Sequence, residues 1–471
     1  MNTKAVAIGA VAVVAVVAGG YVIADRTADA RARSVLEQHA AALGTGEQLT
    51  WTAVDANPFG AAVVIDGLTY SRADGYQARA TTVRASGLSE AGADTARAEG
   101  VTITLPGDGA MTIAAVDIAQ VAPVSGLPAG TALSGDVAPA IIGGLNAKRI
   151  AVSDVSFVAE DKSARLTVKG MSVDDVVNGR YGRITLTGLD VAAEDDFALS
   201  VKDLSLSGLD LSPLRGDMAE IEKAASDAFG LTELRLGAVS INGIAPTGAV
   251  SLGGMTLTDL ERLQGTVVSS RLRLDHLQLP ASLLADEAPL LAMALDSLGR
   301  KTLDLSLDVA QRYTADNGAL TVGPVTVRGE GLGEAVLKMD FTGVPLVELA
   351  RAMDADDFEA VILMTENIAF VGATLTYTDD RLADVLVEQA AGGDRAGFAA
   401  AAAEMVTINA GTEVAPADVT MVAEAVQAFL LGTTAFSVSL TPQQPMLLPV
   451  VMESAETGEL TRLLTLKVEG R

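Results

Sequence analysis

The sequence predicts an α+β fold dominated by antiparallel strands, with an N-terminal transmembrane helix and a helical C-terminal third. Three observations support this prediction. An alternating pattern with a central glycine recurs through the middle of the chain, residues 5–24 form an uncharged apolar run, and helical segments become frequent from Pro345 onward. Period-two alternation is typical of strands with one apolar face, and twenty apolar residues suffice to cross a bilayer as a helix. We therefore expect an exported, elongated β-repeat body.

The repeating pattern is clearest at residues 184–191, where apolar and polar residues alternate on both sides of Gly188. The phase of the alternation changes at the glycine, so the strand would turn inside out unless the backbone accommodated one extra residue. A β-bulge does this, and glycine suits it because it tolerates positive φ. The pattern, with copies starting about 20 residues apart, predicts an antiparallel meander or a solenoid. The other copies lie at residues 166–173 (Gly170), 204–211 (Gly208), 250–257 (Gly253 and Gly254) and, more loosely, 63–70.

The composition excludes several classes of function. The net charge of −27 and the pI of about 4.4 argue against nucleic-acid binding, because phosphate recognition relies on clustered Lys and Arg. The same charge argues against electrostatic adhesion of the body to an anionic membrane. The chain has no Cys, which excludes disulfides, thiolate metal sites and cysteine nucleophiles.

The N-terminus predicts a single-pass inner-membrane protein. Residues 1–4 would be a cytoplasmic tip, and residues 5–24 a transmembrane anchor of about 30 Å. Lys4 favours a cytoplasmic N-terminus and therefore a periplasmic body. A cleaved signal peptide is the alternative, with Ala28-Asp29-Ala30 as a small-x-small site, and either reading exports the rest of the chain. Residues 25–44 predict a helix that continues the anchor as a stalk.

Residues 45–343 predict a β-rich periplasmic body with inserted helices at 213–230 and 280–298 and a long loop at 123–144. We expect Trp51 to pack in the core rather than at a membrane interface. Turn signals between alternating segments predict hairpins. They are Asp74-Gly75, Asp108-Gly109, Asn178-Gly179 and Asn317-Gly318.

Residues 344–471 predict an α+β cap that closes the repeat body. Helical signals cover residues 345–353, 356–364, 380–405 and 416–431, and strand signals cover 369–377, 435–440 and 463–468.

No catalytic, cofactor or metal site is predicted, and we expect the chain not to be an enzyme. A Ser-His-Asp hydrolase would need His39 or His276, together with a pocket joining that histidine to a serine and a carboxylate. Alternation places His276 on the polar side of its strand with Arg271, Arg273 and Asp275, where it would be solvated.

The remaining motifs also favour structural roles. Residues Gly329, Gly331 and Gly333 resemble a dinucleotide loop, but the third glycine comes one residue early and no helix follows, so we expect a bulge or turn. The acidic clusters lack the ligand spacing of calcium loops, and the last two are expected to cap helices. These clusters lie at residues 194–196, 354–357 and 379–380.

The chain resembles the AsmA-like and YdgA-like envelope proteins of Gram-negative bacteria. The resemblance is carried by the apolar run 5–24, by residues 204–211 with the Ser-Pro-Leu that continues them, and by residues 370–380. The last stretch is similar to uncharacterised alphaproteobacterial exported proteins. The resemblance implies a periplasmic curved sheet tied to the inner membrane, with a role in envelope maintenance or lipid traffic and no catalytic residues.

The function therefore depends on what covers the apolar side of the strands. The chain's own helices, a second sheet or lipid acyl chains would each serve. We expect a non-enzymatic envelope protein that binds or passes phospholipid along this face. The alternative is a structural scaffold or protein-interaction module without a small ligand.

Overall fold

The computed structural model describes residues 28–41, 43–57, 61–89, 92–122, 146–177, 180–193, 197–210, 230–244, 248–285, 288–409, 416–456 and 463–470. Several sequence predictions fall outside these ranges. They are the cytoplasmic tip 1–4, the anchor 5–24, the whole loop at 123–144, the turn at Asn178-Gly179, the acidic cluster 194–196 and most of the helix at 213–230. Among the residues that are described, no helix is both long and apolar enough to cross a membrane.

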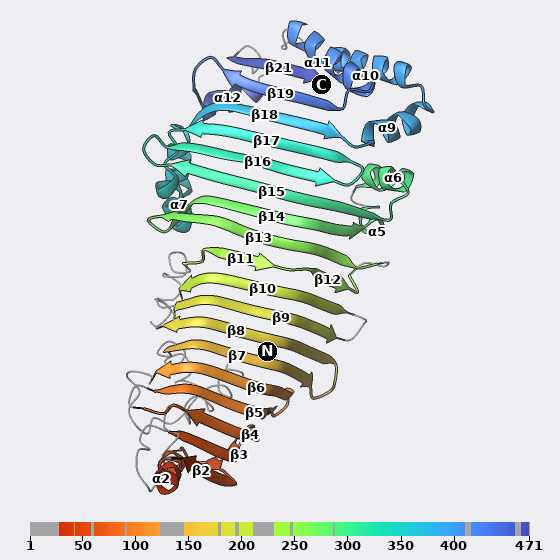
Figure 1. Cartoon of the computed structure of the whole chain (residues 1–471). Coiled ribbons are helices and arrows are strands. Elements are labelled where there is room, and N and C mark those ends of the chain that lie inside the picture. Colours follow the sequence, from red (N-terminus) through yellow and green to blue (C-terminus); the bar gives the residue numbers. More distant parts are fainter. Residues whose placement is uncertain are drawn as a thin grey trace. The chain divides into compact units, whose positions relative to one another are not determined.

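The chain divides into two compact units, residues 1–243 and 244–471, so the division lies inside the range 45–343 that the sequence suggested as one body. Both units consist mainly of antiparallel strands with some helices, as predicted (Figure 1).

Unit 1 is a meander in which each strand from β3 to β10 pairs with the next. Strands β1 and β2 both pair with β3, and β11 and β12 both pair with β10. The strands are β1 (Glu47–Thr50), β2 (Ala53–Asn57), β3 (Ala62–Arg72), β4 (Gln77–Ser86), β5 (Ala93–Leu105), β6 (Gly109–Ala122), β7 (Asn146–Ala159), β8 (Ala164–Val177), β9 (Arg180–Ala193), β10 (Ala198–Asp210), β11 (Glu233–Leu236) and β12 (Val239–Asn242).

Helix α2 (Ala28–Ala41) falls within the predicted stalk, residues 25–44, and it packs against β2. Leu36 is 3% exposed within the hydrophobic core, and the Asp29 carboxylate accepts a hydrogen bond from the Ala56 amide at 2.6 Å. Trp51 packs against the same core, which confirms its predicted place.

Residues with left-handed backbone conformation recur on alternate strands of unit 1. One set occupies β3, β5, β7 and β9, and a second set occupies β6, β8 and β10. Glycine adopts this conformation without a steric penalty, and Asp is among the few other residues that enter it readily. The first set is Gly67, Gly100, Asp154 and Gly188, and the second is Gln120, Asp175 and Gly208.

These positions change the phase of a strand without changing its register. Between β8 and β9, Val168 pairs with Leu189 and Met171 pairs with Leu186, so two residues separate the apolar pairs on both strands. The extra residue on one strand is thus matched on its neighbour, and one of the two residues at that level, Gly188, is left-handed with φ +61°. The bulge expected at Gly188 is therefore a matched pair of insertions.

The prediction of a bulge at Gly170 is wrong. This glycine pairs in register with Thr187 and is not left-handed, because Asp154 and Gly188 on the flanking strands already supply that conformation. The same applies to Gly253 and Gly254 of β13, where the left-handed residue is His276 on the neighbouring strand.

Unit 2 is a second antiparallel meander, in which β13 to β19 pair in chain order, β21 pairs with β19 and β20 pairs with β18. Figure 1 shows α5, α6 and α9 at one end of these strands and α7 at the other. The strands are β13 (Val250–Leu263), β14 (Thr266–Pro280), β15 (Thr302–Thr314), β16 (Ala319–Gly329), β17 (Gly333–Thr342), β18 (Ala369–Asp379), β19 (Ala435–Pro442), β20 (Met446–Leu447) and β21 (Leu464–Gly470). The helices are α5 (Ala281–Leu284), α6 (Pro289–Ser297), α7 (Leu346–Asp354), α8 (Phe358–Thr365), α9 (Leu382–Ala391), α10 (Arg395–Asn409), α11 (Pro416–Leu430) and α12 (Leu448–Glu456).

Two predicted helices are each divided in two. The helix expected over 280–298 forms α5 and α6, because Pro289 begins a new helix. The helix expected over 380–405 forms α9 and α10, because Gly392 and Gly393 are both left-handed and terminate α9. The hairpins predicted at residues 74–75, 108–109 and 317–318 are confirmed.

We predict that Gly188→Val destabilises the fold by more than about 1 kcal/mol, because a β-branched residue is strained in the left-handed region. The added Cβ would also meet the Lys169 side chain at 2.7 Å. Chemical denaturation of the full chain measures the change.

Gly170→Val is the matched control, because Gly170 is not left-handed and its added Cβ would lie 3.1 Å from Thr187 Oγ1. Its cost should be clearly smaller. Equal costs for the two variants would contradict the assignment of a special backbone role to Gly188.

Candidate functional site

An apolar row of directly paired residues crosses unit 1, and its side chains change from buried to partly exposed along the row. On β2 to β6 its members are 6% exposed or less, and they include Val83 at 1% and Ala98 at 0%. From β7 onward they are only half-buried, and Met171 on β8 is 39% exposed. The row is Val54, Ile65, Val83, Ala98, Val116, Val152, Met171, Leu186, Leu204 and Leu236.

Unit 2 carries a comparable apolar row. Directly opposed residues in antiparallel strands share one face, so these side chains form a continuous apolar surface. Every member from β13 to β17 is half-buried, and Leu375 on β18 is 41% exposed. The row is Leu257, Leu272, Val309, Val325, Leu337, Leu375, Val438 and Val468.

Helix α11 covers the last strands of this face. It packs on β19 and β21, and its Phe429 ring contacts Tyr377 and Phe436, whose centroids lie 5.8 and 6.4 Å away. Val468 of β21 is accordingly 8% exposed. The apolar row is thus closed at β21 and partly open from β13 to β18.

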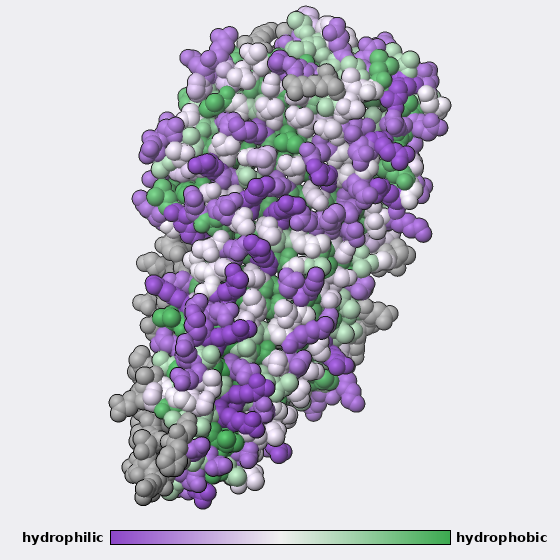
Figure 2. Space-filling view, in the orientation of Figure 1, coloured by the Kyte–Doolittle hydropathy of each residue, from purple (hydrophilic) through white to green (hydrophobic). Residues whose placement is uncertain are grey.

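The opposite face of unit 2 is polar and carries paired charges. Figure 2 shows many hydrophilic side chains over β13–β17 on the face turned to the viewer. Arg271 makes two hydrogen bonds to the Asp308 carboxylate, at 2.9 and 2.6 Å, and Arg273 binds Asp275 at 2.7 Å. A sheet with one apolar and one polar face is expected to leave its polar side to solvent.

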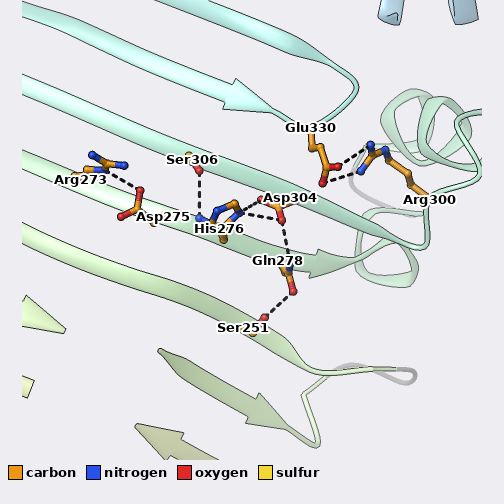
Figure 3. A network of polar contacts seen from close by, with 9 residues as sticks. All are labelled: Ser251, Arg273, Asp275, His276, Gln278, Arg300, Asp304, Ser306 and Glu330. Atoms are coloured by element: carbon orange, nitrogen blue, oxygen red, sulfur yellow. Dashed lines mark hydrogen bonds and ion pairs between the residues drawn. The ribbon is translucent and has the colours of Figure 1, made fainter. Parts of the chain in front are cut away.

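The polar face also carries a network of polar and ionisable side chains centred on His276 (Figure 3). The β14–β15 register shifts by one residue between Leu274 and Leu277, and His276 adopts a φ of +51° in this bulge. Its Nδ1 lies 3.1 Å from Asp304 Oδ1, and its backbone amide donates to Ser306 Oγ at 3.2 Å.

Further hydrogen bonds hold the Asp304 carboxylate in place. The Gln278 side chain donates to Asp304 Oδ2 at 2.9 Å and accepts from the Ser251 hydroxyl at 3.1 Å. Two shallow depressions of about 340 and 450 Å³ share the residues His276, Ser306 and Arg328.

The structure therefore brings a histidine, a serine and a carboxylate together, as a hydrolase would require. A serine nucleophile needs its hydroxyl on an imidazole nitrogen, whereas Ser306 Oγ is bound to the backbone amide of the bulge. The His276 side chain is 68% exposed, which confirms the solvated position expected from alternation. These contacts therefore stabilise the backbone of the bulge at His276. The absence of enzymatic activity stays a prediction.

The remaining motifs have structural roles in the described residues. The loop from Gly329 to Gly333 is the β16–β17 hairpin turn, as predicted, and Asp380 accepts from the Gly331 amide at 3.0 Å. Asp357 caps α8 by accepting from Ala360 N at 3.1 Å. The described residues contain no metal-ligating cluster, and His39 belongs to α2.

Asp379 has a similar role at the start of α9. Its carboxylate accepts from the backbone amides of Arg381 and Ala383, each at 3.2 Å. Asp357 and Asp379 therefore cap helix starts, as predicted, whereas Asp354 is the last residue of α7.

Sequence reasoning missed the bulge at His276, although the signal was present. Residues 272–279 repeat the glycine pattern with histidine in the glycine position, and residues 150–157 do so with Asp154. Histidine and aspartate are enriched among non-glycine residues with positive φ. A search that admitted them would have located both positions.

Comparison with known proteins gives one partial match. A family model described as an uncharacterized protein matches residues 326–471, and none of the curated proteins matches the chain. The matched segment begins within β16 and includes α7 to α12.

We predict effects of different size for two substitutions at His276. His276→Gly should change the free energy of unfolding by less than about 0.5 kcal/mol, because glycine relieves the left-handed strain while the exposed Asp304 contact is lost. His276→Val should cost at least about 1 kcal/mol. Urea denaturation tests both, and equal destabilisation would show that the imidazole rather than the backbone conformation matters.

The Arg271–Asp308 pair should make stability depend on pH. Arg271 hydrogen-bonds the carboxylate and lowers the pKa of Asp308 below its ordinary value. The pair therefore contributes above the unfolded-state pKa of Asp308, and the contribution is lost as the pH falls through the lower folded-state pKa. Arg271→Gln should cost at most about 1 kcal/mol near pH 7 and less toward about pH 3.

Urea denaturation over this pH range measures the effect. In an Asp308→Asn background the same arginine change should no longer depend on pH. A pH dependence that persisted there would assign the effect to another carboxylate.

Proposed function

We propose that the protein is an inner-membrane-anchored periplasmic envelope protein that holds or passes phospholipid acyl chains along the apolar face of its sheets. The anchor would be residues 5–24, with the body on the periplasmic side and without enzymatic activity. The apolar run, Lys4 and the resemblance to AsmA-like and YdgA-like envelope proteins support this location.

The single observation that carries the lipid proposal is the change in burial along the apolar rows. In unit 1 the side chains of the row are buried on β2 to β6 and partly exposed from β7 to β11. In unit 2 it is half-open from β13 to β18 and buried on β21 beneath α11. Side chains such as Met171 and Leu375 expose apolar area that an acyl chain would remove from water.

The residues of these rows suit acyl chains rather than a polar ligand. Leu and Val predominate, and apolar surfaces bind ligands mainly by removing apolar area from water. The acidic surface does not oppose the proposal, because acyl chains carry no charge. A phospholipid headgroup would remain near the strand ends or in solvent.

Site-specific photo-crosslinking in the full chain tests the proposal. A benzophenone amino acid placed at Val327 or Leu375, which are 39% and 41% exposed on the apolar face, should crosslink ³²P-labelled phospholipid in cells. We expect labelling several-fold above the level of the control positions, because a lipid on this face lies within reach of both side chains.

The controls are Thr326 and Thr376, which adjoin the test positions on the same strands and lie on the opposite face. Any lipid bound at the anchor is common to all four proteins. Equal labelling on both faces, or none on the apolar face, would remove the lipid proposal and leave the scaffold alternative.

A further inference from the structure

Helices α7 and α8 connect β17 to β18 and carry an exposed apolar surface, which we call the α8 patch. It consists of Met353, Phe358, Ile362 and Leu363, which are 65, 70, 62 and 56% exposed. Ile362 follows Phe358 by four residues, so the two side chains lie on one side of α8.

Helix α8 has more apolar residues than it buries against the rest of the protein. Six of its eight residues, from Phe358 to Met364 apart from Glu359, are apolar, and none of the eight is fully buried. A helix that is apolar on every side is normally buried, whereas a surface helix keeps a polar outer face. The outer face of α8 therefore has the composition of an interface.

The chain segment that carries the α8 patch is strongly acidic. Residues 346–368 contain Arg351 as their only basic residue, and its guanidinium hydrogen-bonds the Gln264 side chain. The six acidic residues are Glu348, Asp354, Asp356, Asp357, Glu359 and Glu366.

Helix capping explains only part of this acidity. Asp357 caps the start of α8, and Glu359 lies in its first turn, where a negative charge is favourable. Glu366 is the C-terminal cap residue of α8, where the helix dipole disfavours a carboxylate. Asp354 and Asp356 precede the cap and add charge that the helix does not require.

We propose that the α8 patch is a docking surface for a basic amphipathic segment of another protein. An apolar stripe on the partner would cover Phe358 and Ile362, and flanking Lys or Arg residues would face the carboxylates. An anionic bilayer would be repelled by the same carboxylates, and a second copy of this chain would bring like charges together. This inference is independent of the lipid proposal, because it uses a different surface.

A synthetic probe tests the surface directly. The probe is an amphipathic Leu/Lys helix of about 18 residues carrying a benzophenone, and its matched control replaces every Lys by Glu. After irradiation with the full chain, mass spectrometry should place the crosslinks of the Leu/Lys probe within residues 346–366. The Leu/Glu probe should give at least tenfold fewer.

Variants separate the patch from general acidity. Phe358→Ser with Ile362→Ser should reduce crosslinking about tenfold, and Glu359→Gln with Glu366→Gln should weaken it and flatten its salt dependence. The control is Met405→Ser with Ile408→Ser on α10, whose side chains are similarly exposed at 61 and 70%. It should leave crosslinking unchanged. Crosslinks distributed over the whole acidic body, or insensitive to the α8 variants, would overturn the proposal.

A lipid surface is distinguished by a second readout. The chain has no native Cys, so Ala355→Cys provides a unique position for an environment-sensitive dye beside the patch. The Leu/Lys probe should shift its emission, and phosphatidylcholine vesicles should not. A shift with vesicles alone would show that the patch meets a bilayer rather than a protein.

Discussion

The sheets depend on one backbone constraint: where the apolar positions of a strand change phase, a residue at that level must adopt a left-handed conformation. In unit 1 this residue occurs on every second strand, as at Gly67, Gly100, Asp154 and Gly188. Because the intervening strand carries a matching extra residue, the pairing register continues unchanged on both sides. An unmatched insertion would have shifted every side chain beyond it to the other face.

The unchanged register explains why a single apolar row crosses unit 1 without a break. Its members are valine, isoleucine and alanine on β2 to β6, where burial is nearly complete, and mainly methionine and leucine from β8 onward, where burial is partial. The longer side chains thus occur where the surface is open. Unit 2 reaches a similar row by true register shifts, at His276 and at Gly323-Pro324, so two backbone solutions give one kind of surface.

Much of the fold could be predicted because strand alternation and turn chemistry are local. The strands and the hairpin at Asn317-Gly318 were located by these signals alone. The glycine rule failed at Gly170 because a left-handed residue is required once per pair of strands, which a single strand does not reveal. The contact between His276 and Asp304 was hidden for the same reason, since 28 residues separate the two in sequence.

The burial of the apolar rows was the least predictable feature, because alternation shows which side chains share a face and not what covers them. Phe429 covers Tyr377 and Phe436 only because α11 returns to the sheet after two other helices. The exposure of Phe358 was likewise hidden, since an apolar helix between two strands suggests a buried connection.

The surfaces of unit 2 differ in charge, and they therefore differ in the kind of partner that each can bind. On the polar face, Arg271 is paired with Asp308 and Arg328 with Glu334, so each of these two arginines is neutralised locally by a carboxylate on a solvated surface. Residues 346–368 have a net charge of −5 in 23 residues, against −27 for the whole chain of 471. Acidity that served solubility alone would be spread over the surface rather than gathered around exposed Phe358 and Ile362. The apolar row, with its uncharged side chains, is suited to a lipid, whereas the α8 patch selects its partner by charge as well as by apolar area.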